Sequence, residues 1–130
     1  MKKIPLLTVL ATLTASMMIY AAEINVYSHR HYDSDKILFT QFTKETGIKV
    51  NVVKASADQL IQRLISEGKN SPADVLLTVD AGRLHRAKAA GVLQPVKSAT
   101  LSKNVPSAMR DPEGHWYGMT VRARVIVYSK

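Results

Sequence analysis

Asp74-Val75-Leu76-Leu77-Thr78-Val79 is the stretch of this sequence that decides its fold. The run is short and almost wholly apolar, which is typical of a strand buried on both faces of a parallel sheet. A helix is expected directly after it, because Asp80 can cap a helix and Gly91 can end it. The positions of this helix that are expected to face inward are Leu84, Ala87 and Ala90. A buried strand followed at once by a capped helix predicts an α/β fold.

The same pairing of strand and helix occurs twice before this stretch. Residues 24–28 alternate apolar and polar side chains, as a half-buried strand does. Asp33 or Ser34 then caps a helix that Gly47 ends. The apolar face of that helix consists of Ile37, Leu38 and Phe42. Residues 49–54, which are rich in valine, predict the second strand.

The helix after the second strand has the clearest local signals in the chain. Ser56 and Gln59, three residues apart, form a capping box, and Gly68 ends the helix. Its apolar stripe consists of Leu60, Ile61, Leu64 and Ile65. Three strand–helix pairs in succession predict a mostly parallel sheet with helices on both faces, connected by right-handed crossovers.

Two further signals lie downstream. Asp111-Pro112-Glu113-Gly114 predicts a turn, and residues 121–128 predict a last strand. In sheets of this kind, ligands bind beyond the carboxyl ends of the strands. The places that this rule selects are residues 29–33, Ser56 with Ala57, Asp80 and the region around Arg122.

The composition is that of a folded globular chain. Its 130 residues suffice for one domain, and 46 % of them are hydrophobic and 22 % charged. Cysteine is absent, which excludes disulfides, zinc held by cysteine, iron–sulfur clusters and a catalytic thiol. Any metal ion must therefore be held by oxygen and imidazole ligands.

The first residues predict export. Lys2 and Lys3 precede an uncharged run of 19 residues, from Ile4 to Ala22, which ends in two alanines. A basic start, an apolar middle and small residues at the end are typical of a secretory signal peptide, here residues 1–22. The run is long enough for a membrane anchor, but Pro5 and several threonines dilute it and favour cleavage. Residues 23–130 are then the exported domain.

The charge of that domain excludes one class of partner. Without Lys2 and Lys3, 16 basic side chains stand against 10 acidic ones. The basic residues are scattered and no aromatic stripe accompanies them, and an exported chain seldom meets nucleic acid, so we expect no nucleic-acid partner. The positive charge fits a solvated basic surface, an anionic ligand or an acidic docking partner, and charge alone does not choose among them.

A cluster of polar side chains, His29-Arg30-His31-Tyr32-Asp33, follows the first strand. In one interpretation it is a loop that is polar because it meets water. In a second, His29, His31 and Asp33 hold a divalent ion in an exported metallohydrolase, because they lie on one face of an extended segment. In a third, Tyr32 supplies a hard, anionic phenolate to a trivalent cation such as Fe(III), and His31 adds a nitrogen.

This cluster and several other stretches resemble the periplasmic ferric-iron-binding proteins, the substrate-binding components of iron ABC transporters. The most specific elements are Arg-His-Tyr at residues 30–32 and Arg-Ala-Arg-Val at residues 122–125. The full resemblance runs through residues 27–33, 42–50, 71–80, 90–95 and 121–128, and so covers essentially the whole exported part of the chain.

The resemblance implies a fold. Family members have two α/β lobes that close over Fe(III) in a hinged cleft. Residues 23–130 are therefore expected to be the N-terminal lobe of a type II periplasmic binding protein, truncated before the second lobe. The adjacent tyrosine pair that the second lobe contributes in the family has no counterpart in this sequence.

The resemblance also implies a ligand set. Tyr32 stands where the family has an iron-ligating tyrosine, and His31 precedes it as an auxiliary ligand. Arg122 is the expected holder of a synergistic anion such as carbonate, with Arg124 as the alternative. The function implied is capture of ferric iron, without catalysis, by a monomer that delivers it to an ABC permease in the inner membrane. The alternatives are a binding protein for another anionic solute and the metallohydrolase described above.

Overall fold

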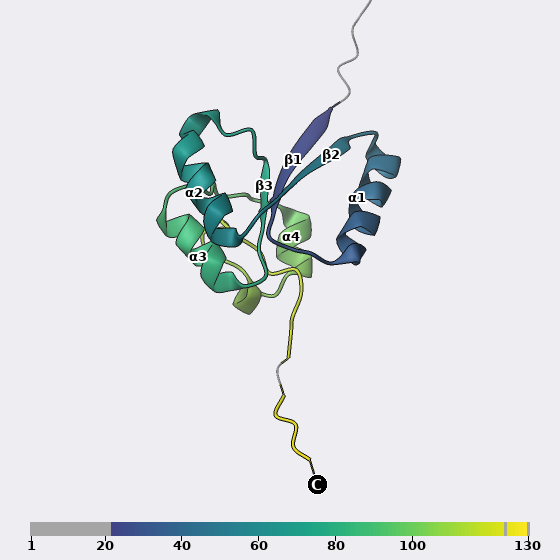
Figure 1. Ribbon diagram of the computed structural model, residues 1–130, viewed down its shortest axis with the longest axis vertical. Helices are drawn as coiled ribbons and strands as arrows, with labels where there is room; N and C mark the ends of the chain where they lie inside the picture. Colours follow the sequence, from purple (N-terminus) through teal and green to yellow (C-terminus); the bar gives the residue numbers. More distant parts are fainter. Residues whose placement is uncertain (1–21, 124, 130) are drawn as a thin grey trace, which may run out of the picture.

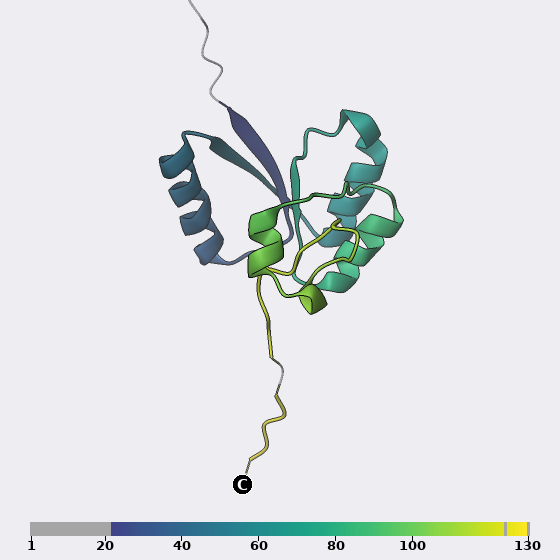
Figure 2. The same cartoon turned by 180° about the vertical axis from the view of Figure 1, so that it is seen from behind.

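The computed structural model describes residues 22–123 and 125–129, and shows a small parallel sheet between two layers of helices (Figure 1). Helix α1 covers one side of the sheet and helices α2 and α3 the other, as the view from behind confirms (Figure 2). The elements are β1 (Glu23–Ser28), α1 (Asp33–Thr46), β2 (Lys49–Lys54), α2 (Ala57–Glu67), β3 (Val75–Leu77), α3 (Ala81–Ala89) and α4 (Ala99–Asn104), with short 3-10 helices at Gly68–Asn70 and Ser107–Met109. The predicted α/β class and parallel sheet with helices on both faces are confirmed.

Strand β1 lies in the middle of the sheet, whose order is β2-β1-β3. Both of its neighbours run parallel to it, with Tyr27 opposite Val53 on one side and Leu76 on the other. This order brings the carboxyl ends of all three strands to one edge, where the loop after β1 meets the residues that follow β3.

Local capping signals place the helix ends largely as predicted. Ser56 and Gln59 form both halves of the capping box, and Asp80 accepts a hydrogen bond from the Arg83 backbone N–H at 2.9 Å. Gly47 ends α1 with φ of 72°, a left-handed conformation that glycine adopts without strain. The predicted cap of α1 was wrong, because the helix begins at Asp33 itself and Tyr32 precedes it without a side-chain cap.

The core lies between β1 and α2. Tyr27, Leu60 and Leu64 pack there, and Tyr27 and Leu60 are each 1 % exposed. The Tyr27 hydroxyl still finds a partner, since it donates to a carboxylate oxygen of Glu67 at 2.8 Å. Burial and this hydrogen bond raise the pKa of Tyr27. The predicted apolar stripe of α2 is confirmed except at Ile65, which is 45 % exposed.

Residues of three predicted elements are more exposed than expected. Strand β3 is not buried on both faces, because Val75 is 39 % exposed and Leu76 and Leu77 are only half-buried. In the described part of the chain, β3 also forms one edge of the sheet. On α1, Ile37 and Leu38 are 69 % and 62 % exposed, because the described residues place no element against that face. On α3, Ala87 is fully buried as predicted, whereas Ala90 is exposed.

The predicted last strand, residues 121–128, is wrong. Residues 121–123 and 125–128 have no regular secondary structure, and the exposed fractions of Val121, Ile126 and Tyr128 are 76 %, 96 % and 80 %. A strand needs a hydrogen-bonding neighbour, and the described residues offer none here. The predicted turn at Asp111-Pro112-Glu113-Gly114 does form, with the Gly114 N–H donating to the Asp111 carbonyl at 3.0 Å.

The predicted signal peptide, residues 1–22, lies outside the described residues except for Ala22 and stays a prediction. Among the residues that are described, no helix combines the length and the apolar character needed to cross a membrane.

Candidate functional site

The carboxyl edge of the sheet contains a cavity of about 260 Å³. Its lining comes from three distant parts of the chain: the loop after β1, the segment after β3 and the stretch that follows the 3-10 helix Ser107–Met109. The lining residues are Arg30, Tyr32, Val79, Thr120, Val121 and Arg122. Two of the four regions that the sequence selected, residues 29–33 and the region around Arg122, therefore meet at one place.

A buried ion pair fixes the loop that carries Tyr32. Nε and Nη2 of Arg30 donate to the two carboxylate oxygens of Asp35 at 3.0 and 2.9 Å, and their side chains are only 18 % and 11 % exposed. The Arg30 backbone N–H donates to the hydroxyl oxygen of the buried Ser28 at 3.1 Å. The Asp35 N–H in turn donates to the Tyr32 carbonyl at 3.2 Å. The loop is thus tied both to the end of β1 and to the first turn of α1.

Tyr32 lies between two guanidinium groups. Nη2 of Arg122, which is 90 residues away in the sequence, donates to the Tyr32 hydroxyl oxygen. The guanidinium carbon of Arg30 lies 5.1 Å from the centre of the Tyr32 ring, within the range of a cation–π contact. His31 lies beside them, with its ring centre 4.9 Å from that of Tyr32. The three residues predicted for the site, His31, Tyr32 and Arg122, therefore lie at one edge of the sheet.

The charges around the cavity favour an anion. Its lining includes two arginines and no carboxylate. Asp35 neutralises Arg30, whereas no carboxylate pairs with Arg122 among the residues that the structure describes. A phenol oxygen and an imidazole beside a guanidinium that no described carboxylate neutralises can hold a hard cation together with a small anion. In such a site the phenolate and the imidazole bind the metal, and the arginine binds the anion.

The other predicted candidates do not join this site. Ser56 is occupied by its capping box and Asp80 by the start of α3. Hydrogen bonds from the Arg83 backbone and side chain lower the pKa of Asp80, which suits a permanently charged helix cap. Arg124, the alternative to Arg122, lies outside the described residues.

The grouping that a metallohydrolase needs is not formed. His29, His31 and Asp33 do not converge into a metal-binding group in the described part of the chain. The Asp33 side chain is 93 % exposed and pairs with Lys36. The His29 Nδ1 is buried and has no hydrogen-bond partner among the described residues, and His29 does not line the cavity.

Asp111, Glu113 and His115 form a second cluster of potential metal ligands. The ammonium group of Lys88 already occupies the cluster, because its Nζ lies 2.8 Å from a carboxylate oxygen of Asp111 and 3.2 Å from one of Glu113. The hydrogen bonds from Lys88 and His115 hold the pKa of Asp111 well below its usual range. The cluster thus attaches the turn at 111–114 to helix α3.

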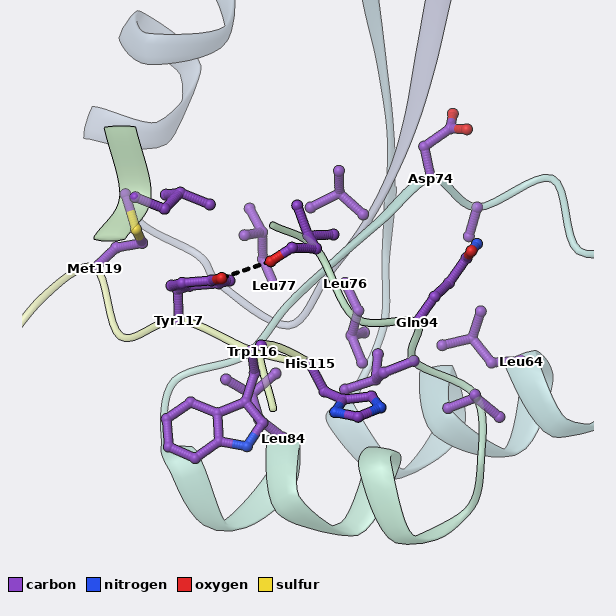
Figure 3. Close-up of a pocket in the computed structure, with 17 residues that line it drawn as sticks. Leu64, Asp74, Leu76, Leu77, Leu84, Gln94, His115, Trp116, Tyr117 and Met119 are labelled. Atoms are coloured by element: carbon purple, nitrogen blue, oxygen red, sulfur yellow. Dashed lines mark hydrogen bonds between the residues drawn. The ribbon is translucent and has the colours of Figure 1, made fainter. Parts of the chain in front are cut away.

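A larger groove lies beside β3, with a volume of about 570 Å³ (Figure 3). Its walls are mostly apolar and include Leu76 and Leu77 of β3, Leu84 of α3 and the aromatic residues Trp116 and Tyr117. The only hydrogen bond drawn in it runs from the Tyr117 hydroxyl to the Val96 carbonyl. Neither Tyr32 nor Arg122 lines this groove, so it is separate from the candidate site.

Sequence reasoning missed Arg30 and Asp35 as parts of the site. Both are charged residues in a stretch that is otherwise polar, as exposed loops are. They are five residues apart, across a loop and the start of a helix, and ion pairs are not expected at this spacing. The only sequence signal that pointed to Arg30 was its place in the Arg-His-Tyr element, where no role was assigned to it.

Comparison with known proteins finds one matching family and several similar individual proteins. The family profile of bacterial extracellular solute-binding proteins matches residues 28–130. Iron uptake protein A1 of Synechocystis is 58 % identical over 108 residues, which are 83 % of this chain and 30 % of that protein. The major ferric iron-binding protein of Neisseria gonorrhoeae is 35 % identical over 112 residues, which are 83 % of this chain and 33 % of that protein.

Solved structures agree with these sequence matches. A Trichodesmium protein (IdiA, FutA), in complex with iron and citrate, is 56 % identical and superposes with a TM-score of 0.73 over 75 % of this chain and 31 % of that one. The ferric binding protein from Campylobacter jejuni is 45 % identical, with a TM-score of 0.71 over 72 % of this chain and 30 % of that one. The chain spans about a third of the length of the curated relatives that it matches. These relatives are named for iron uptake or iron binding, and none of them for catalysis.

Proposed function

The chain belongs to the family of bacterial extracellular solute-binding proteins, and we propose that it takes part in the periplasmic capture of ferric iron for an ABC importer. One observation carries the proposal: Tyr32 and Arg122, 90 residues apart, meet at the carboxyl edge of the sheet beside a cavity without carboxylates. The names of the similar proteins from Synechocystis and Neisseria support iron as the cargo.

Tyr32 is the proposed iron ligand. A phenolate oxygen is hard and anionic and suits Fe(III) better than softer divalent ions. His31, whose ring lies beside that of Tyr32, is the proposed auxiliary ligand. Binding as phenolate releases a proton from a group whose ordinary pKa is about 10, so iron affinity should fall as the pH falls.

Arg122 is the proposed holder of a synergistic anion such as carbonate. Its guanidinium has no carboxylate partner in the described residues and lines the cavity beside Tyr32. An arginine fork can donate two parallel hydrogen bonds to the oxygens of a planar anion. The anion would neutralise Arg122 and place one or two oxygens beside the metal.

The proposed site is one wall of a cleft. Fe(III) takes about six donors, and Tyr32, His31 and a bound anion supply only part of them. Water or an iron chelator can supply others, and the similar Trichodesmium protein was solved with iron and citrate together. Fe(III) citrate is therefore a suitable form in which to offer the metal.

Residues 1–22 are proposed to direct export as a signal peptide, and residues 23–130 to act in the periplasm. Delivery to a permease in the inner membrane is proposed as the final step, because the family to which the chain belongs consists of extracellular solute-binding proteins.

Equilibrium dialysis against Fe(III) citrate in bicarbonate buffer tests the proposal. Tyr32→Phe should lower iron affinity at least tenfold, whereas Tyr128→Phe, which alters an exposed tyrosine away from the cavity, should leave it unchanged. Arg122→Gln should weaken binding several-fold, with most of the loss disappearing when bicarbonate is withheld. A Tyr32→Phe variant that retains iron as well as the unmodified chain would refute the assignment.

A different anionic solute is the second candidate, favoured by the Arg122 guanidinium, which no carboxylate of the described residues neutralises. The affinity for such a solute would depend on Arg122 and would not change in Tyr32→Phe. Dialysis against phosphate or sulfate with the same two variants therefore separates the two functions.

A further inference from the structure

The turn at residues 111–114 is fastened to helix α3 by one lysine. Nζ of Lys88 lies within 3.2 Å of carboxylate oxygens of both Asp111 and Glu113. The Asp111 side chain is only 6 % exposed and that of Lys88 22 %, so little water competes for their contact. We call these three residues, Lys88, Asp111 and Glu113, the clamp. A cation that bridges two carboxylates of one turn fixes that turn against the helix that carries the cation.

The clamp holds the closed end of a narrow hairpin, residues 109–118. The Asp111 N–H donates to the Trp116 carbonyl at 3.0 Å, and the Gly118 N–H donates to the Met109 carbonyl at 2.7 Å. A β-carbon at Gly118 would lie 2.8 Å from that carbonyl oxygen, so the two arms approach as closely as only glycine permits. The position of Gly118 is therefore tied to that of the clamp.

The chain passes from this hairpin directly into the wall of the iron-site cavity. Only three residues separate Gly118 from Arg122. One of them, Thr120, lines the iron-site cavity together with Arg122 and Val79. Gly118, Thr120 and Val79 also line a neighbouring pocket of about 240 Å³ at the start of α3. The segment is thus packed along its length, and a shift of the hairpin reaches Arg122 through few residues.

We propose that the clamp positions Arg122 beside Tyr32, so that Lys88 controls the anion-binding side of the site without lining it. Lys88 is a positioning residue, because the cavity wall includes Arg122 and Tyr32 but not Lys88. Tyr32 has a separate anchor, the ion pair of Arg30 with Asp35, so the two halves of the site are positioned independently. The role in anion binding rests on the proposed function, whereas the contact of Arg122 with Tyr32 does not.

Tyrosine ring resonances of a chain labelled with ¹³C at tyrosine test the positioning before any iron is added. The Tyr32 signal is the one that is missing in Tyr32→Phe. Arg122→Gln should shift this signal, because Arg122 donates to the Tyr32 hydroxyl. Lys88→Met should shift it in the same direction, since it releases the hairpin. Arg86→Met is the matched control: it removes another ion pair of α3, with Asp58 at 2.7 Å, and should leave the signal in place.

Two more variants test the path from the clamp to Arg122. Lys88→Arg keeps a cation that can bridge both carboxylates, and the Tyr32 signal should stay close to that of the unmodified chain. Gly118→Ala forces the hairpin arms apart and should shift the signal as Lys88→Met does. Far-UV circular dichroism checks that each variant folds. A Tyr32 signal that stays in place in Lys88→Met and Gly118→Ala, or that moves equally in Arg86→Met, would overturn the proposal.

Equilibrium dialysis against Fe(III) citrate connects the clamp to the proposed function. In bicarbonate, Lys88→Met should weaken iron binding several-fold, and it should add no further loss to Arg122→Gln, because the arginine that the clamp positions is then absent. Without bicarbonate, Lys88→Met should bind iron nearly as the unmodified chain does. Losses that add, or that are equal with and without bicarbonate, would overturn the positioning of Arg122. An unmodified chain that binds no iron would refute the proposed function instead, and the Tyr32 signal would still decide the role of the clamp.

Discussion

The ion pair between Arg30 and Asp35 supports a prediction of stability that can be worked from its geometry. The perturbation is Asp35→Ala, which removes two charged hydrogen bonds of 3.0 and 2.9 Å from side chains that are 18 % and 11 % exposed. A hydrogen bond to a charged group contributes about 1.5–3 kcal/mol, and breaking a fully buried pair costs about 3–5 kcal/mol. Because Arg30 still reaches water in part, we expect Asp35→Ala to lower the free energy of unfolding by about 2–3 kcal/mol.

Urea denaturation followed by circular dichroism measures this loss. Arg30→Ala should cost a similar amount, and the double variant should cost less than the sum, with a coupling energy of about 1.5 kcal/mol. Lys36→Ala is the matched control, because it removes the exposed pair of Lys36 with Asp33 and should change nothing measurable. If Asp35→Ala behaved like the control, or if the two single effects simply added, the ion pair would not hold this loop.

Two further predictions concern the core and the acid dependence of stability. Leu60 is 1 % exposed, so Leu60→Ala should lower the free energy of unfolding, measured by urea denaturation, by about 3 kcal/mol. Ile65→Ala, on the exposed side of the same helix, should lower it by less than about 1 kcal/mol. Equal losses would mean that this helix packs differently. Lys88 and His115 depress the pKa of Asp111, so its contribution to stability is present above the ordinary aspartate pKa of about 4 and is lost as the pH falls further. Asp111→Asn should therefore flatten the decline of the melting temperature in acid, and an equally steep decline in the variant would contradict the assignment.

Elements with local signals were predictable from the sequence. The capping box at Ser56 and Gln59 and the glycine end of α1 at Gly47 depend only on residues within a few positions of each other. Strand β1 was predicted as a half-buried strand over residues 24–28, but it begins at Glu23 and its residues 26–28 are all buried, because it lies in the middle of the sheet. The valine run of β2 is a local signal, and β2 spans the predicted residues 49–54. Neighbouring residues suffice to specify such features, because the hydrogen bonds that define them are local.

Features that depend on distant partners were not predictable in this way. The apolar run after Asp74 indicated a strand but not its place in the sheet, and β3 proves to be an edge. The sequence of residues 121–128 favours a strand, yet its described residues, 121–123 and 125–128, form none, because no described neighbour pairs with them. At the site, the resemblance selected Tyr32 and Arg122, but Arg30 and Asp35 become a partly buried ion pair only when the loop after β1 folds against the first turn of α1.

The visible absorption spectrum of the chain loaded with Fe(III) nitrilotriacetate shows whether Tyr32 binds the iron. Phenolate bound to Fe(III) gives a charge-transfer band, so we expect a band that saturates as iron is added. The band should vanish in Tyr32→Phe and persist in Tyr128→Phe, which keeps the site intact. A band that survives in Tyr32→Phe, or a folded chain that holds iron without any band, would contradict the assignment of Tyr32 as the iron ligand.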